Sequence, residues 1–82
     1  MLTAHELRGY IMKGLPCDYV EVLGDDGKHF EALIVSPQFT GKNKVQQHKL
    51  VYLALGDRMR SEIHALAMRT LTPHAWAQSA VK

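Results

Sequence analysis

The sequence has little cysteine and no long apolar stretch. Its single cysteine, Cys17, cannot form an internal disulfide, which is typical of a protein from a reducing compartment. No apolar run approaches the roughly 20 residues that a membrane-spanning helix needs. The first residues also lack the basic stretch followed by an apolar stretch that marks a secretory signal peptide. We therefore expect a cytoplasmic protein with no membrane association.

The chain is short and its composition is ordinary. Its 82 residues, with a mass of 9.2 kDa, predict one domain over residues 1–82, in which any site must be shallow or shared with a partner. Hydrophobic residues make up 46% and charged residues 22%, which argues against disorder. Residues 1–31 carry six acids and three bases, whereas residues 32–82 carry two acids and seven bases. The basic half is compatible with a solvated surface or with an acidic or phosphate-bearing partner.

Capping signals and periodicity predict the first half of the fold. Thr3 and Glu6 form a capping-box pattern ahead of a helix over residues 4–14. Residues 18–23 and 29–36 alternate between polar and apolar side chains, which is the pattern of strands. The sequence GDDG between them favours a tight turn, so we expect an antiparallel hairpin.

The second half is predicted in the same way. Residues 39–42 are expected to form a loop, and Asn43 is expected to cap a helix that ends near residue 55. A short helical turn over residues 57–62 and a third strand over residues 63–71 follow. Proline at position 73 opens a final helix through residue 80, and we expect Trp76 to anchor this helix to the core.

The predicted order is α-β-β-α-(α)-β-α, an α/β (α+β) domain with a three-stranded mixed sheet. The second and third strands are joined through a helix, so we expect them to pair in parallel. Parallel strands begin at the same edge, which places His29 and His64 together, near Asp25 and Asp26. Two imidazoles at one edge are either half of a metal site or two unrelated surface histidines, and the residues alone leave both interpretations open.

No motif in the sequence indicates catalysis. The chain lacks a glycine-rich phosphate loop, a Gly-x-Ser-x-Gly elbow, a His-Glu-x-x-His helix and a Cys-x-x-Cys pair. The predicted hairpin places Cys17 at the opposite end from His29, so we interpret it as a buried structural thiol. We expect no enzymatic activity and no cofactor bound by the isolated chain.

Basic residues near the start of the predicted second helix suggest a different kind of site. Lys42, Lys44 and Lys49 can form a stripe there, and Arg69 would join it if the fold brings it near. KH modules clamp a nucleic-acid backbone with a Gly-x-x-Gly loop, but residues 41–44 read GKNK and lack the second glycine. No aromatic residues alternate with these bases to stack on nucleotides. A solvated face and a nucleic-acid surface are both compatible with this pattern.

Several motifs together resemble the BolA family, most closely its short bacterial BolA-like branch. They extend over nearly the whole chain and comprise residues 24–31 (GDDGKHFE), 35–36 (VS), 39–42 (FTGK), 48–52 (HKLVY), 63–66 (IHAL) and 71–76 (LTPHAW). The resemblance implies a type II KH-like fold. It also implies a pairing with a monothiol glutaredoxin through a [2Fe–2S] cluster that is shared with that partner and with glutathione. Some bacterial members of the family are DNA-binding transcriptional regulators of stress response and morphology.

The resemblance also implies candidate cluster ligands. The C-terminal histidine of the family matches His64. The second ligand of the family is a histidine or cysteine from the loop between the first two strands. Counting back from Phe30, that place holds Asp26 in this chain, so His29 is the nearest candidate and Asp26 the alternative position.

Two functions from different classes follow from these residues. The first is a non-enzymatic iron–sulfur accessory protein, in cluster trafficking or iron and stress signalling, with His64 and His29 at the cluster. The alternative is a KH-like DNA-binding regulator whose phosphate contacts come from Lys42, Lys44, Lys49 and Arg69. Without a partner, the chain is expected to be a monomer or a weak dimer.

Overall fold

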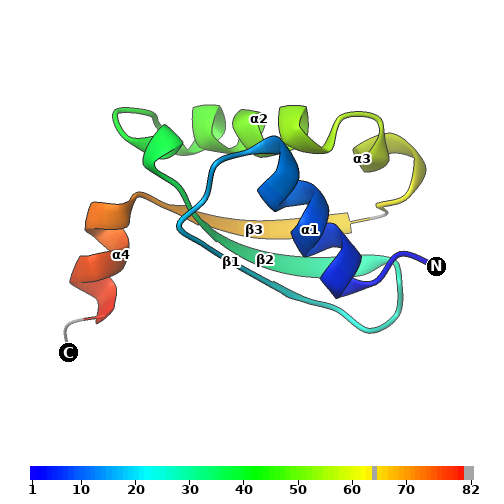
Figure 1. The fold of residues 1–82 in the computed structure, drawn as a ribbon. Helices are drawn as coiled ribbons and strands as arrows, with labels where there is room; N and C mark the ends of the chain where they lie inside the picture. Colours follow the sequence, from blue (N-terminus) through cyan, green and yellow to red (C-terminus); the bar gives the residue numbers. More distant parts are fainter. Residues whose placement is uncertain (64, 81–82) are drawn as a thin grey trace.

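A three-stranded sheet carries two helices, α1 and α2, on one face (Figure 1). The computed structural model describes residues 1–63 and 65–80. Its elements are α1 (Ala4–Gly14), β1 (Tyr19–Leu23), β2 (His29–Val35), the 3-10 turn η1 (Pro37–Phe39), α2 (Lys44–Leu55), α3 (Arg58–Ser61), β3 (Ala65–Leu71) and α4 (Pro73–Ala80). Within these described residues, no helix has both the length and the apolar character to cross a membrane. The predicted α+β class and element order are confirmed.

The sheet is mixed, with β2 in its centre. The strands β1 and β2 are antiparallel, and Tyr19 is the register partner of Val35. The strands β2 and β3 are parallel, with a register that begins at His29 opposite Ala65. The starts of β2 and β3 therefore lie at the same edge of the sheet, as the sequence predicts.

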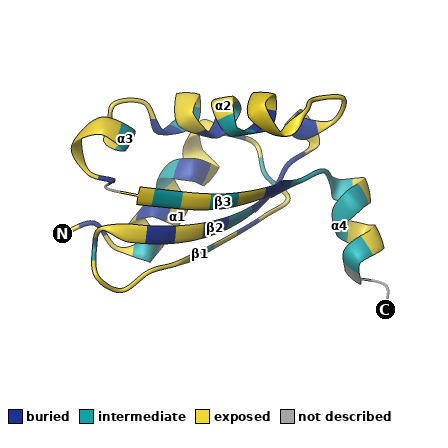
Figure 2. Cartoon of the chain, turned by 180° about the vertical axis from the view of Figure 1, so that it is seen from behind, coloured by how far each residue is buried: buried dark blue, intermediate teal, exposed yellow. Residues whose placement is uncertain are grey.

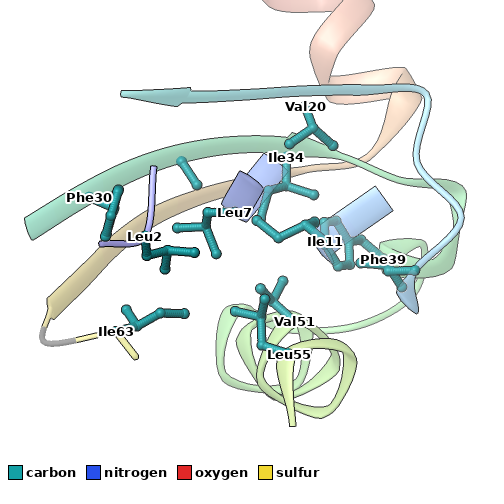
Figure 3. Close-up of a cluster of buried hydrophobic side chains, with 12 residues drawn as sticks. Leu2, Leu7, Ile11, Val20, Phe30, Ile34, Phe39, Val51, Leu55 and Ile63 are labelled. Atoms are coloured by element: carbon teal, nitrogen blue, oxygen red, sulfur yellow. The ribbon is translucent and has the colours of Figure 1, made fainter. Parts of the chain in front are cut away.

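The core fills the space between the helices and one face of the sheet (Figure 3). Alternate strand residues such as Val20, Phe30 and Ile34 are buried there, because successive side chains in a strand point to opposite faces. Helices α1 and α2 contribute the opposing side chains, among them Leu7, Ile11, Val51 and Leu55. The other strand residues form an outer face that neither α1 nor α2 covers.

The helix ends follow the predicted capping chemistry. Thr3 and Glu6 form the capping box of α1, in which each side chain accepts a hydrogen bond from the other residue's backbone N–H. Asn43 caps α2 and forms a second capping box with Gln46. Both boxes satisfy backbone N–H groups that a helix leaves unpaired at its start.

The segment after β2 differs from its prediction. Phe39, expected in a loop, ends the turn η1 and is fully buried in the core. Ser36 begins this turn, because its hydroxyl accepts the backbone N–H of Gln38 at 3.1 Å and donates to the carbonyl of Pro16. A buried aromatic ring in a short turn breaks the periodicity on which the sequence prediction relied.

The attachment of α4 also differs from its prediction. Trp76 does not join the core cluster, so the expectation that it anchors the helix there is wrong. Its ring stacks instead on Tyr19 of β1, with ring centroids 5.2 Å apart and planes 15° apart. Tyr19 lies on the outer face of the sheet, since its neighbour Val20 points into the core. Figure 2 shows α4 at the end of the sheet, apart from the other helices.

A buried polar contact joins α2 to β3. The Thr70 hydroxyl donates to the side-chain oxygen of Gln47 at 2.6 Å, and both residues are buried. The amide nitrogen of Gln47 donates in turn to the carbonyls of Phe39 at 3.3 Å and Lys42 at 2.8 Å. Gln47 therefore links the crossover helix to the third strand and to the loop before the helix.

Replacing Thr70 with valine tests this link. Valine keeps the shape of threonine but removes the donor, so the buried oxygen of Gln47 loses its partner. We expect the free energy of unfolding to fall by about 1–3 kcal/mol, measured by urea denaturation. Thr40→Val is the matched control at an exposed threonine and is expected to stay within about 0.5 kcal/mol of the parent chain. Equal stability of the two variants would contradict the role assigned to Gln47.

Candidate functional site

The turn between β1 and β2 is organised around the carboxylate of Asp26. Its Oδ1 accepts the backbone N–H of Lys28 at 2.8 Å and that of His29 at 2.9 Å. Its Oδ2 lies 2.9 Å from Nδ1 of the His29 ring. The hydrogen bonds from His29, then that from Lys28, hold the pKa of the Asp26 carboxyl well below its usual value. The carboxylate therefore stays ionised at neutral pH and accepts hydrogen bonds without donating any.

The start of the same turn is packed too tightly for a side chain. Gly24 has a φ of +153°, and a Cβ atom there would lie 2.6 Å from the carbonyl oxygen of His29. The same atom would lie 2.7 Å from the ring of Phe30. Only glycine accommodates this approach, because a side chain at position 24 would displace the backbone of His29 or the ring of Phe30.

The His29 side chain is accessible to a docking partner. It is 62% exposed and borders two hollows at the edge of the sheet. One hollow, of about 630 Å³, lies against α3 and is lined by Lys28 and Arg60 among others. The other, of about 420 Å³, is lined by residues that include Phe30 and Ala65. A partner can therefore approach the ring from either hollow.

The predicted ligand His64 lies outside the described residues. Ile63, its neighbour on one side, is buried in the core. Ala65, its neighbour on the other side, is the register partner of His29 and donates its backbone N–H to the carbonyl of Lys28 at 2.9 Å. Among residues 1–63 and 65–80, no three side chains of histidine, cysteine, aspartate or glutamate are grouped to hold a metal ion.

The basic residues do not form one stripe. Lys42 and Lys49 are exposed in and near α2, but the Lys44 ammonium group donates to the backbone carbonyl of Thr70. Thr70 points toward α2, so its neighbour Arg69 lies on the outer face of the sheet. The fold does not bring Arg69 beside the lysines, so Arg69 does not join the predicted stripe.

The sequence does not predict the hydrogen bonds that Asp26 accepts from the backbone of its own turn. From the sequence, Asp26 is the alternative position for the second cluster ligand, but its spacing to Lys28 and His29 carries another signal. An aspartate two and three residues before backbone donors is the pattern of an Asx turn, and Lys28 and His29 stand at those positions. The signal is weak because aspartate is also common in turns that lack these bonds.

Comparison with known proteins identifies relatives over most of the chain. Residues 14–75 match the family model described as BolA-like protein. The human BolA-like protein 2 is 36% identical over 85 residues, which cover 99% of this chain and 98% of the human protein. The structure of a bolA protein homologue from Coxiella burnetii is 40% identical, with a TM-score of 0.79, and covers 94% of this chain and 99% of the homologue. The BolA domain of SufE1 from Arabidopsis thaliana is 33% identical, with a TM-score of 0.75, and covers 90% of this chain and 98% of that domain.

Cys17 lies at the other end of the sheet from His29. It precedes Asp18, whose backbone N–H donates to the carbonyl of Val35 at 2.8 Å. Its thiol is half-buried and donates to the carbonyl of Leu15 at 3.1 Å. Burial, together with the charge of Asp18, raises the pKa of the Cys17 thiol to about 11. The thiol is therefore protonated at neutral pH, but it is half-buried and not fully buried as the sequence predicts.

The raised pKa predicts how Cys17 reacts with iodoacetamide. Only the thiolate is nucleophilic, so the alkylation rate of the folded chain should rise about tenfold per pH unit from pH 8 to pH 10. The chain unfolded in urea is the control, and its rate should level off above about pH 9, as for an ordinary cysteine. Mass spectrometry of timed samples measures both rates. If the alkylation rate of the folded chain levels off at the same pH as that of the unfolded chain, the raised pKa of Cys17 is wrong.

Proposed function

The chain belongs to the BolA-like family, and from this membership we propose that it is a non-enzymatic iron–sulfur accessory protein. It pairs with a monothiol glutaredoxin through a shared [2Fe–2S] cluster, the pairing that the family resemblance implies. Similarity to the BolA domain of SufE1 is in keeping with an iron–sulfur role. The chain then serves cluster trafficking or iron signalling.

One observation supports this proposal more than any other: the parallel register of β2 and β3. It pairs His29 with Ala65, the residue that follows His64 in the sequence. In the proposal, His64 is the first nitrogen ligand and His29 the second. Each would bind the iron that faces this chain, while the glutaredoxin thiolate and glutathione supply sulfur to the other iron.

The chemistry of these side chains fits the proposed cluster. Imidazole is a suitable ligand for iron, and histidines replace two cysteines on one iron of Rieske centres, which raises the reduction potential. The His29 ring is exposed, so a partner can approach it without rearrangement of the core. Histidine ligands must be unprotonated to bind metal, which makes the shared cluster sensitive to pH in the physiological range.

The alternative function, DNA binding by the KH-like fold, has less support. It requires Lys42, Lys44, Lys49 and Arg69 to contact phosphates together. Arg69 lies on the other face of the sheet, and Lys44 is already bonded to a backbone carbonyl. Two exposed lysines near α2 are left for phosphate contact from this set.

Single histidine substitutions test the cluster ligands. We mix the chain anaerobically with a monothiol glutaredoxin, glutathione, iron and sulfide, and follow the visible circular dichroism of the complex. His64→Ala is expected to abolish the spectrum of the mixed complex, and His29→Ala to shift or weaken it, because each removes a nitrogen from iron. His74→Ala removes an exposed imidazole from α4 and is the control that should match the parent chain. A parental spectrum from His64→Ala would rule out that ligand.

Salt dependence tests the DNA alternative. Each phosphate contact would lower log K by about 0.9 per tenfold rise in salt, so the four contacts of this alternative would give a steep loss of affinity. We expect fluorescence anisotropy with labelled duplex DNA to show weak binding that Lys49→Gln leaves unchanged. Tight binding at 50 mM salt that falls steeply by 200 mM and is weakened by Lys49→Gln would favour the DNA-binding regulator instead.

A further inference from the structure

We propose that Asp26 is a positioning residue for the cluster site. Its carboxylate holds the His29 ring in the tautomer with the proton on Nδ1, so that Nε2 is the nitrogen that binds iron. This inference rests on the proposed function and deepens it. It assigns Asp26 to the support of a ligand, and it names which ring nitrogen serves as that ligand.

The contacts of Asp26 argue against a direct bond to iron. Both carboxylate oxygens are engaged within the turn, Oδ1 with two backbone N–H groups and Oδ2 with the ring of His29. Binding iron through this carboxylate would break contacts that shape the loop between β1 and β2. Iron in a sulfide cluster also prefers thiolate and imidazole to a carboxylate. The geometry therefore favours a role in which Asp26 positions His29 and does not bind iron itself.

The tautomer follows from the identity of the two groups. A neutral imidazole has one nitrogen with a proton and one with a lone pair. An ionised carboxylate only accepts, so the 2.9 Å contact with Oδ2 requires the proton on Nδ1 of His29. The opposite tautomer would set a lone pair against the carboxylate. Nε2 then carries the lone pair that a metal requires.

The same carboxylate also fixes where the ring is. Oδ1 holds the backbone N–H of His29 while Oδ2 holds its ring, so one side chain fixes both ends of the histidine. Carboxylates that hold metal-binding histidines in this way set ring orientation and raise ligand basicity. Loss of such a partner weakens metal binding by about 10–100-fold in known sites. We expect a loss of this size here.

Asp26→Asn separates the two functions of the carboxylate. The asparagine oxygen still accepts the two backbone N–H groups, so the turn is retained. Its NH₂ group replaces Oδ2 and must donate to a lone pair on Nδ1, which moves the ring proton to Nε2. Asp25→Asn is the matched control, because it removes the same charge from the neighbouring residue of the turn.

The tautomer is read in the chain without any cluster. Long-range ¹⁵N–¹H correlation spectra of the histidine-labelled chain at about pH 9, where imidazole is neutral, distinguish the two forms. We expect the Nδ1–H form of His29 in the parent chain and in Asp25→Asn, and the Nε2–H form in Asp26→Asn. The Nε2–H form in the parent chain would overturn the inference. Far-ultraviolet circular dichroism checks that each variant is folded.

Cluster affinity is measured on the same three proteins. Each is titrated into the glutaredoxin under the anaerobic conditions above, and the midpoint is followed by visible circular dichroism. Asp26→Asn should weaken formation of the mixed cluster about 10–100-fold, and Asp25→Asn should leave it unchanged. If the parent chain forms the cluster and Asp26→Asn forms it equally well, the positioning role is wrong while the proposed function stands. If the parent chain forms no mixed cluster, the proposed function fails, and the role of Asp26 toward iron fails with it.

Discussion

The parallel pairing of β2 and β3 is the constraint on which the rest of this structure depends. Parallel neighbours cannot be joined by a tight turn, so the chain must cross over the sheet through η1, α2 and α3. That crossover supplies Val51 and Leu55, which cover the core face together with α1. It also brings the starts of both strands to one edge, where His29 lies opposite Ala65. Core formation and assembly of the candidate site therefore have the same topological cause.

The two ends of the sheet differ in hydrogen bonding and in exposure. At the Val35 end, Gln47 and Lys44 of α2 are both bonded to Thr70, which ties the crossover helix to β3. At the His29 end, the side chains of His29 and Asp26 are exposed, and His29 borders two hollows. A buried, hydrogen-bonded end keeps the strands in register, and the exposed end is accessible to a partner.

A domain of this size has little room for an enclosed metal site. A chain of 82 residues has a small core, and its folded surface is large relative to its interior. A site at the edge of the sheet leaves that core intact, whereas an enclosed set of four ligands would displace part of it. Asp26 shows how such an edge is ordered without burial, since one exposed carboxylate orders the turn and the ring beside it.

Local patterns in the sequence predict every helix and strand of the described chain except the 3-10 turn that ends at Phe39. The sequence also predicts the parallel pairing that brings His29 beside the start of β3. These features depend on residues within a few positions of one another, or on the rule for crossover connections, and both can be read along the chain. The contacts of Trp76 with Tyr19, of Gln47 with Thr70 and of Lys44 with the β3 backbone were decided by tertiary structure. Each joins residues from different elements, and which residues meet depends on how whole helices pack against the sheet.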